Sequence, residues 1–201
     1  MLGELYDSSK TILENLFCLM PGHNMTVRLD KSFNISRYYD YVLESQKLPK
    51  IESYSEAIVL VREELERSTK YHMVSDVEVG AFLSGGVDST AIVAMMQHLS
   101  STKINTFSLG FKGATSDYDE TEVATRSAKY LGCKHHNIRI DDDYVFGIFD
   151  DFIESMDQPS ADGINTYIVS LETAKETKVA LSGLGGDEIF AGYPHFKSIQ
   201  K

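Results

Sequence analysis

The chain has 201 residues, 42% of them hydrophobic and 24% charged, which suffices for one α/β domain or for one domain and part of another. Its net charge is -11, with twelve acidic and four basic residues between positions 116 and 162, so it lacks the basic footprint of a nucleic-acid-binding protein. No apolar run is long enough to span a membrane, no signal peptide is visible, and Cys18 and Cys133 are too few for a disulfide framework, which predicts a reduced, cytoplasmic protein with no nucleic-acid or membrane partner.

Residues 1–48 are predicted to form a short opening region. The segments 25–29 and 35–39 alternate apolar and polar residues on either side of a polar stretch, which is typical of a β-hairpin. Because an isolated hairpin is marginally stable in water, we expect it to pack against another element.

A helix is predicted after the linker at Leu48-Pro49. Ser53 stands three residues before Glu56, the spacing of a capping box at a helix start. Apolar residues then recur at spacings of three and four, which predicts one apolar stripe made by Tyr54, Ala57, Ile58, Val61 and Leu65.

From residue 77 onwards, strands alternate with helices, which predicts a parallel, doubly wound sheet. The strands are expected at 77–83, 104–111, 136–140 and 179–182, and the helices at 88–99, 120–131, 146–156 and 165–175. Gly132 is expected just past a helix end. The adjacent His135 and His136 would face opposite ways on their strand, which favours a structural role over a shared metal. The acidic run 141–143 is predicted to cap the next helix.

A glycine turn, Ser84-Gly85-Gly86-Val87-Asp88-Ser89-Thr90, links the first of these strands to a helix. The glycines allow a close backbone approach and positive φ, and the N–H groups of the first helical turn attract an anion. The hydroxyls of the turn would add donors for phosphate oxygens, and Asp88 would hold a Mg2+ that bridges to them. No Lys precedes the last Ser or Thr, so this is not the Walker loop. The turn predicts a phosphate site; the alternative is a tight turn without a ligand.

A second glycine turn occupies residues 180–193, ALSGLGGDEIFAGY. SGGVDST resembles the signature of the N-type ATP pyrophosphatases, the PP-loop superfamily. The second turn is similar to the second signature of the synthetase domain of glutamine-hydrolysing asparagine synthetase. Similar stretches lie at 156–166, at Asp119-Glu120 and at His135-His136, and the resemblance covers residues 10–197.

The resemblance implies an α/β fold with a doubly wound, mostly parallel sheet of the adenine nucleotide alpha hydrolase-like type, preceded by a hairpin left from a glutaminase domain. It assigns residues 1–48 to the tail of that domain and a linker, and residues 49–201 to a C-terminally truncated ATP-pyrophosphatase domain. The implied activity is an ATP-dependent, AMP-forming amidation of aspartate to asparagine through a β-aspartyl-adenylate. The ammonia would come from glutamine, through a glutaminase domain absent from this chain.

The resemblance also implies the site residues. Asp88 and Asp187 are expected to be catalytic and to hold Mg2+, both at strand ends of one sheet edge, where ligands bind in such folds. The residues expected to bind ATP are Leu83, Ser84, Gly85, Gly86, Asp88, Ser89, Thr90, Leu109, Ser182 and Gly183.

Three features depart from the family. Leu184 stands where the family often has a Glu that helps ammonia addition, and a leucine cannot transfer a proton. Cys18 lies in an apolar stretch, whereas the glutaminase nucleophile is the mature first residue, so we expect no glutamine hydrolysis. The chain ends shortly after Tyr193, where the family continues with a helical segment, which predicts a piece without full activity.

Two other functions stay open. The chain could belong to a related amidotransferase or ring-closing ligase that acts on another carboxylate, or it could be an ATP-binding module without turnover. Because the predicted hairpin lacks the rest of its sheet, residues 1–45 are expected either to be disordered or to pair with a second copy in a homodimer.

Overall fold

A computed structural model describes residues 9–11, 13–113, 119–157, 160 and 163–199. The chain divides into two compact units, Met1–Glu56 and Ala57–Lys201, which are described one at a time. The sequence placed its boundary after residue 48, and the assignment of residues 1–48 to a glutaminase tail stays a prediction.

The first unit contains the predicted hairpin, made by β1 (His23–Val27) and β2 (Phe33–Arg37), followed by the short helix α1 (Tyr41–Ser45). The strands are antiparallel, and both begin two residues earlier than expected. The shift has a local cause: the side chain of Asp30 accepts a hydrogen bond from the Ser32 amide (2.9 Å) and closes the turn around it. Leu29 therefore lies in the turn and is fully exposed.

The hairpin is amphipathic. The pairs Met25–Ile35 and Val27–Phe33 lie on one face, whereas Asn24–Ser36 and Thr26–Asn34 lie on the other. The four apolar side chains are between 48% and 65% exposed, so this face has no cover among the residues that the structure describes.

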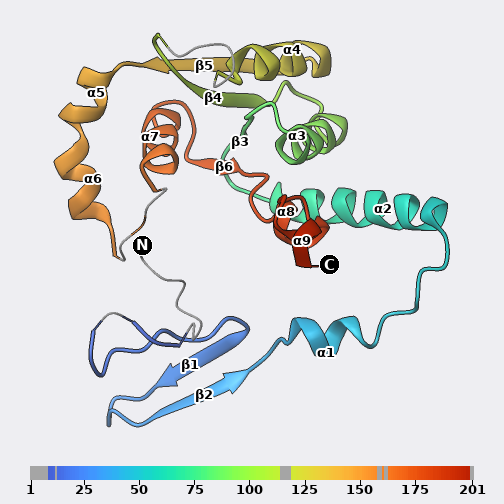
Figure 1. The fold of residues 1–201 in the computed structure, drawn as a ribbon, viewed down its shortest axis with the longest axis vertical. Helices are drawn as coiled ribbons and strands as arrows, with labels where there is room; N and C mark the ends of the chain where they lie inside the picture. Colours follow the sequence, from blue (N-terminus) through green and yellow to red (C-terminus); the bar gives the residue numbers. More distant parts are fainter. Residues whose placement is uncertain (1–8, 12, 114–118, 158–159, 161–162, 200–201) are drawn as a thin grey trace. The chain divides into compact units, whose positions relative to one another are not determined.

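The second unit is an α/β sheet in which the four strands are parallel and lie in the order β5-β4-β3-β6 (Figure 1). It confirms the predicted α/β class. The strands are β3 (Val79–Phe82), β4 (Asn105–Phe111), β5 (Lys134–Ile140) and β6 (Val179–Leu181). The helices are α2 (Tyr54–His72, which begins in the first unit), α3 (Val87–Leu99), α4 (Thr121–Leu131), α5 (Asp142–Gly147), α6 (Phe149–Ser155), α7 (Gly163–Thr173), α8 (Gly186–Phe190) and α9 (Phe196–Ile199).

Helices cover both faces of this sheet. On one face, alternate residues of β3 pack with α3 and α4 in a core of Val79, Ala81, Leu83, Val93, Met96, Ile104, Ala124 and Ala128. Phe82 and Phe107 point to the opposite face, where α7 contacts β4. From β3 the chain adds β4 and then β5 on one side, and it then returns to add β6 on the other side of β3. The strand order therefore reverses between β3 and β6, which is a topological switch point.

The two histidines of β5 have the opposed orientations that their adjacency predicts. His135 lies between the hydroxyls of Thr106 (3.0 Å) and Ser108 (3.2 Å), whereas His136 stacks on Phe107 and bonds Asn105 (2.9 Å). Burial, and then the neighbouring His136, lower the pKa of His135. Both rings serve the sheet, and no cluster of three or more metal-ligating side chains occurs in the described part of the chain.

The single helix expected over residues 146–156 is wrong: the structure has two short helices, α5 and α6, with a break at Ile148. The Asp141 carboxylate accepts a hydrogen bond from the Tyr144 amide (3.1 Å), so the acidic run does cap a helix, but one that begins at residue 142. Gly147 is the last residue of that helix, and Ile148 is its C-cap.

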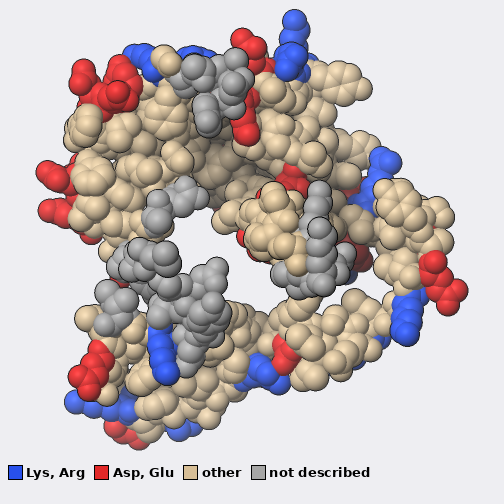
Figure 2. All heavy atoms as spheres, viewed as in Figure 1, with Lys and Arg blue, Asp and Glu red and all other residues tan. Residues whose placement is uncertain are grey.

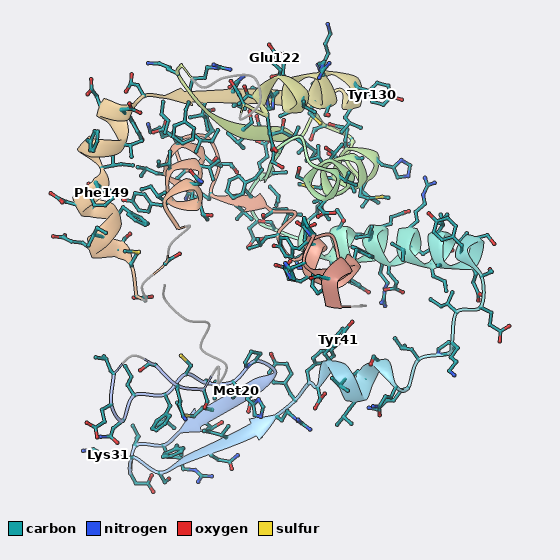
Figure 3. All side chains as sticks on the ribbon, viewed as in Figure 1. Met20, Lys31, Tyr41, Glu122, Tyr130 and Phe149 are labelled. Atoms are coloured by element: carbon teal, nitrogen blue, oxygen red, sulfur yellow. The ribbon has the colours of Figure 1, made fainter. Side chains whose placement is uncertain are left out.

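Acidic side chains are prominent on one part of the surface of the second unit, over α5 and α6 (Figure 2). Glu122 and Tyr130 project from α4 away from the sheet (Figure 3), and Tyr130 is 92% exposed. Among the described residues, no helix combines the length and the apolar character needed to cross a bilayer.

Candidate functional site

The first glycine turn follows β3 directly. Leu83 continues the strand through a hydrogen bond from its amide to the Phe107 carbonyl (2.8 Å), and α3 begins at Val87. Of the two glycines only Gly85 has positive φ (+89°), and a Cβ there would lie 3.1 Å from the Val123 side chain and 3.2 Å from the Ala124 amide. Gly85 therefore lets the turn pack against the start of α4.

Hydroxyl groups hold this turn closed. The Ser89 hydroxyl accepts from the Ser84 amide (3.2 Å) and donates to the Gly86 carbonyl (3.2 Å), and it lies 3.0 Å from the Ser84 hydroxyl. Gly86 is the N-cap of α3 and offers no side chain, so the amides of the first turn are not capped by one. The N-terminus of a 13-residue helix thus faces the turn with its positive dipole end.

The second glycine turn packs against this N-terminus. An ideal Cβ on Gly183 would lie 2.6 Å from the Ser89 nitrogen, and one on Gly186 would meet the Asp88 carboxylate. Gly185 has positive φ (+99°) and starts α8. A Cβ on Gly192 would in turn meet the Asp187 carboxylate. Gly183 therefore leaves room for the first turn, and Gly186 and Gly192 leave room for the side chains of Asp88 and Asp187.

Together the two turns line one cleft of about 530 Å³, here named the loop cleft. Asp88 and Asp187 both line it, as the sequence predicts for two residues at the ends of β3 and β6. No Lys or Arg is among its described lining residues, which are Phe82, Ser84, Gly86, Val87, Asp88, Ser89, Ser182, Gly183, Leu184, Gly186, Asp187, Phe190 and Gly192.

A second cleft, of about 300 Å³, opens at the ends of β3 and β4 and is named the strand-end cleft. Its residues are Phe82, Leu83, Ser84, Phe107, Ser108, Leu109, Phe111, Glu120, Thr121, Asn165, Thr166 and Val169. Leu83 and Leu109, which the family resemblance assigns to ATP binding, lie here. The two clefts share Phe82 and Ser84, so they are neighbours.

One ion pair fixes the far wall of the strand-end cleft. The Asp119 carboxylate accepts hydrogen bonds from the hydroxyl and the amide of Thr121 and pairs with Arg139. The hydrogen bonds from Thr121, and then the Arg139 guanidinium, hold the pKa of Asp119 below its usual range. Asp119 thereby anchors the start of α4, where Glu120 and Thr121 line the cleft.

The structure brings most, but not all, of the predicted residues together. Ser84, Gly86, Asp88, Ser89, Ser182, Gly183 and Asp187 line the loop cleft, and Leu83 and Leu109 line its neighbour. Gly85 and Thr90 line neither. Sequence reasoning did not assign Phe82, Phe190 or Gly192 to the site. Phe190 and Gly192 stand within the second glycine turn, 180–193, which could have pointed to them, whereas Phe82 has no local signal.

Comparisons with known proteins decide the family. The family model for asparagine synthase matches residues 60–201. This chain belongs to the asparagine synthase family. A putative glutamine-hydrolysing asparagine synthetase of Methanocaldococcus jannaschii is 36% identical over 189 residues, which are 92% of this chain and 36% of that protein. Asparagine synthetase 1 of Bacillus subtilis is 33% identical over 86% of this chain and 27% of its own length.

This member of the asparagine synthase family spans only between about a quarter and about a third of the length of those two relatives. Amidase chyE of Penicillium rubens is also similar, at 27% identity over 94% of this chain and 30% of that protein. Among solved structures, the NH3-dependent NAD synthetase of Campylobacter jejuni matches with a TM-score of 0.46 at 15% identity, over 66% of this chain and 59% of that one.

Proposed function

We propose that this chain is part of an enzyme that amidates the side-chain carboxylate of aspartate, and that it is the part that uses ATP to activate this carboxylate. The observation that carries the proposal is the convergence of two glycine turns on one cleft at the switch point between β3 and β6. Membership of the asparagine synthase family supports the same chemistry.

In the proposed reaction, an oxygen of the aspartate side chain attacks the α-phosphorus of ATP, and the bond to pyrophosphate breaks. Ammonia then attacks the carboxyl carbon of the β-aspartyl-adenylate. The bond between this carbon and the oxygen that joins it to phosphorus breaks, and AMP leaves with that oxygen. Negative charge builds on the departing pyrophosphate, so the protein's task is to position ATP and to stabilise that charge. The uncapped amides at the start of α3 and the hydroxyl of Ser84 are hydrogen-bond donors that could stabilise this negative charge.

ATP would span both clefts. Its phosphates would lie in the loop cleft over residues 84–90, and its adenosine part in the strand-end cleft beside Leu83 and Leu109, with Ser182 and Gly183 near the junction. The apolar side chain of Phe82 would contact the base, since Phe107 behind it is only 1% exposed. The shared residue Ser84 lies where the two parts of the nucleotide would meet.

The donor set of the loop cleft fits Mg2+. Two carboxylates line it without a described Lys or Arg, an arrangement that would repel phosphates unless a cation intervened. Asp88 and Asp187 supply the hard oxygen ligands that Mg2+ prefers. The ion would neutralise charge on the phosphates, while Gly186 and Gly192 leave the space that the carboxylates of Asp88 and Asp187 occupy.

Calorimetric titration with ATP, with and without Mg2+, tests the proposal. Asp88→Asn should weaken the Mg2+-dependent binding of ATP about tenfold or more, because a charge-assisted contact is worth about 1.5–3 kcal/mol. Glu188→Gln is the matched control, since Glu188 neighbours Asp187 but lines neither cleft. Equal affinity with and without Mg2+ in the unsubstituted chain would rule out the metal role of Asp88.

A second candidate, an ATP-binding module without turnover, is favoured by one residue. Leu184 is 88% exposed at the tip of the second turn and cannot transfer a proton. Aspartate-dependent release of pyrophosphate would support the ligase, whereas Mg-ATP binding without any release would support the module. Release that depends on another carboxylic acid would identify a related ligase instead.

A further inference from the structure

A cavity of about 280 Å³ lies between α2, α3 and α8, three helices of the second unit, and is named the α2 pocket (Figure 1). One face of α2 forms a wall of this pocket, because Leu65, Ser68, Thr69 and His72 recur at spacings of three and four. The beginning of α3, the second glycine turn and α8 form the other walls.

The floor of the α2 pocket is apolar apart from one hydroxyl group. Ile92 and Leu181 line the pocket and pack against the core of the second unit. Thr69 lies on the lining face of α2 and is 3% exposed, and its hydroxyl has no hydrogen-bond partner among the described residues. A buried hydroxyl without a partner costs free energy, so a molecule that enters the pocket and bonds with it recovers this cost.

Two further side chains of the pocket offer hydrogen-bond acceptors. His72 Nδ1 lies 2.8 Å from the Ser68 carbonyl oxygen, which can only accept, so Nδ1 carries the proton and Nε2 of the neutral ring is an acceptor. Asp88 adds a carboxylate from the first turn of α3. The lining residues that the structure describes include neither Lys nor Arg. The pocket therefore favours a cationic donor over an anion.

The size and chemistry of the pocket define the class of its ligand. Sites for drug-sized ligands have volumes of about 300–1,000 Å³, so a cavity at the lower end of this range suits a small molecule. The apolar floor favours a hydrocarbon body, the carboxylate a positive charge, and the Thr69 hydroxyl an N–H donor. A primary alkylammonium ion combines these three properties, whereas a bare metal ion lacks the hydrocarbon body and a carboxylate has the wrong charge.

We propose that the α2 pocket binds a small primary alkylammonium ion. Its hydrocarbon body lies on Ile92 and Leu181, its N–H group donates to the Thr69 hydroxyl, and the Asp88 carboxylate balances its charge. This site goes beyond the proposed function, whose nitrogen donor is ammonia. It does not rest on that function either, because this binding requires neither ATP nor Mg2+.

An NMR titration of the isotope-labelled chain, without ATP and Mg2+, tests the proposal. The probe is isopentylammonium chloride, and isopentanol and sodium isovalerate present the same branched chain without the positive charge. We expect saturable shifts at Ala91, Ile92 and Leu181, with a dissociation constant of about 1 mM or lower for the amine. The alcohol should bind at least about tenfold more weakly, the carboxylate should not saturate, and ammonium chloride at equal concentration should not displace the amine.

Thr69→Val tests the unpartnered hydroxyl. Valine has nearly the shape of threonine, so the affinity for isopentylammonium should fall about threefold to tenfold, while the free energy of unfolding stays the same or rises. Thr173→Val is the matched control. Thr173 is also 3% exposed, and its hydroxyl also lacks a partner among the described residues, but it does not line the α2 pocket. The affinity of this control for the amine should not change.

A second variant fills the pocket. Ala91→Leu places a larger side chain in the cavity and should abolish saturable binding, and its spectrum without the amine shows that it is folded. Equal binding of the amine, the alcohol and the carboxylate would overturn the proposal, as would a folded Ala91→Leu chain that still binds the amine. An equal effect of Thr69→Val and Thr173→Val would contradict it too. So would a Thr69→Val chain that loses stability and keeps its affinity, because the hydroxyl would then be bonded within the protein.

Discussion

At the scale of single residues, Gly183 decides how closely the two turns of the site approach. Its missing side chain leaves space for the backbone of Ser89, since a Cβ would come within 2.6 Å of the nitrogen and 2.9 Å of the Cα atom. Backbone atoms cannot swing aside as the end of a flexible side chain can. A methyl group at this position must therefore push one turn away from the other.

We expect Gly183→Ala to weaken Mg-ATP binding about tenfold and to lower the free energy of unfolding by about 1–3 kcal/mol, the usual cost of overpacking. Titration calorimetry and urea denaturation measure the two effects. Gly147→Ala provides the control, because a Cβ there meets nothing within 4 Å and φ is not positive. Unchanged affinity in Gly183→Ala would mean that the two turns do not act together.

His135 gives the protein a pH dependence that can be assigned to one side chain. Burial, then the nearby His136, lower the pKa of His135 in the folded state, so the unfolded chain takes up the proton first. The contribution of neutral His135 to the free energy of unfolding is fully present above the unfolded pKa of about 6.5. It is lost as the pH falls from that value towards the lower pKa of the folded state.

The urea midpoint should therefore fall between about pH 7 and pH 5, and His135→Gln should flatten this part of the profile. His98→Gln is the control, because His98 is exposed on α3. A profile that keeps its slope in His135→Gln would contradict the assignment.

At the scale of elements, the hairpin contrasts with the parallel sheet. The apolar face of β1 and β2 is open in the described structure, and a two-stranded hairpin alone has marginal stability. β3 and β4, by contrast, are covered by helices on both faces, and Ala81 and Phe107 are at most 1% exposed.

Hydrogen exchange should accordingly be fast at residues 23–37 and slow at residues 79–82 and 105–111. Measurements at two protein concentrations extend the comparison, since protection of the hairpin that vanishes on dilution indicates pairing with a second copy. Strong protection of the hairpin at every concentration would show that it packs within its own chain, and would contradict its interpretation as a remnant.

The elements differ in how far the sequence predicts them. β3 and β6 could be predicted because each is a short apolar run that a glycine turn follows. β5 is largely polar and was predictable only from the alternation of strands with helices. The end of α4 was predictable from Gly132, which has the positive φ (+77°) that glycine favours. The break at Ile148 could not be predicted, since the cap at Asp141 competes with a helical pattern that continues through it. In the site, Asp88 and Asp187 were predictable from strand ends, whereas Phe190 reaches the cleft only through the tertiary packing of α8.

At the scale of the whole molecule, the net charge of -11 opposes the approach of a nucleotide. ATP is itself an anion, so the long-range field of the protein repels it, and only the local cation would reverse the sign. Salt screens this repulsion, since the Debye length falls to about 8 Å at 0.15 M.

The apparent affinity for Mg-ATP should therefore rise, by about twofold or more, when the ionic strength increases from about 20 mM to about 150 mM at constant free Mg2+. A nucleic-acid-binding protein shows the opposite sign. A steady decrease of affinity over this range would show that local attraction in the cleft, and not the net charge of the protein, sets the salt dependence.

The second glycine turn has a consequence for the molecule as a whole, because the loop cleft shares a wall with the α2 pocket, the cavity of about 280 Å³ between α2, α3 and α8. The shared residues are Asp88, Ser182, Gly183, Leu184, Gly186 and Phe190. A wall shared by two cavities cannot move for one occupant without changing the space offered to the other. Any occupant of the α2 pocket that shifts this wall changes the affinity of the loop cleft by some factor, and linkage requires the ligand of the loop cleft to change the affinity of that occupant by the same factor.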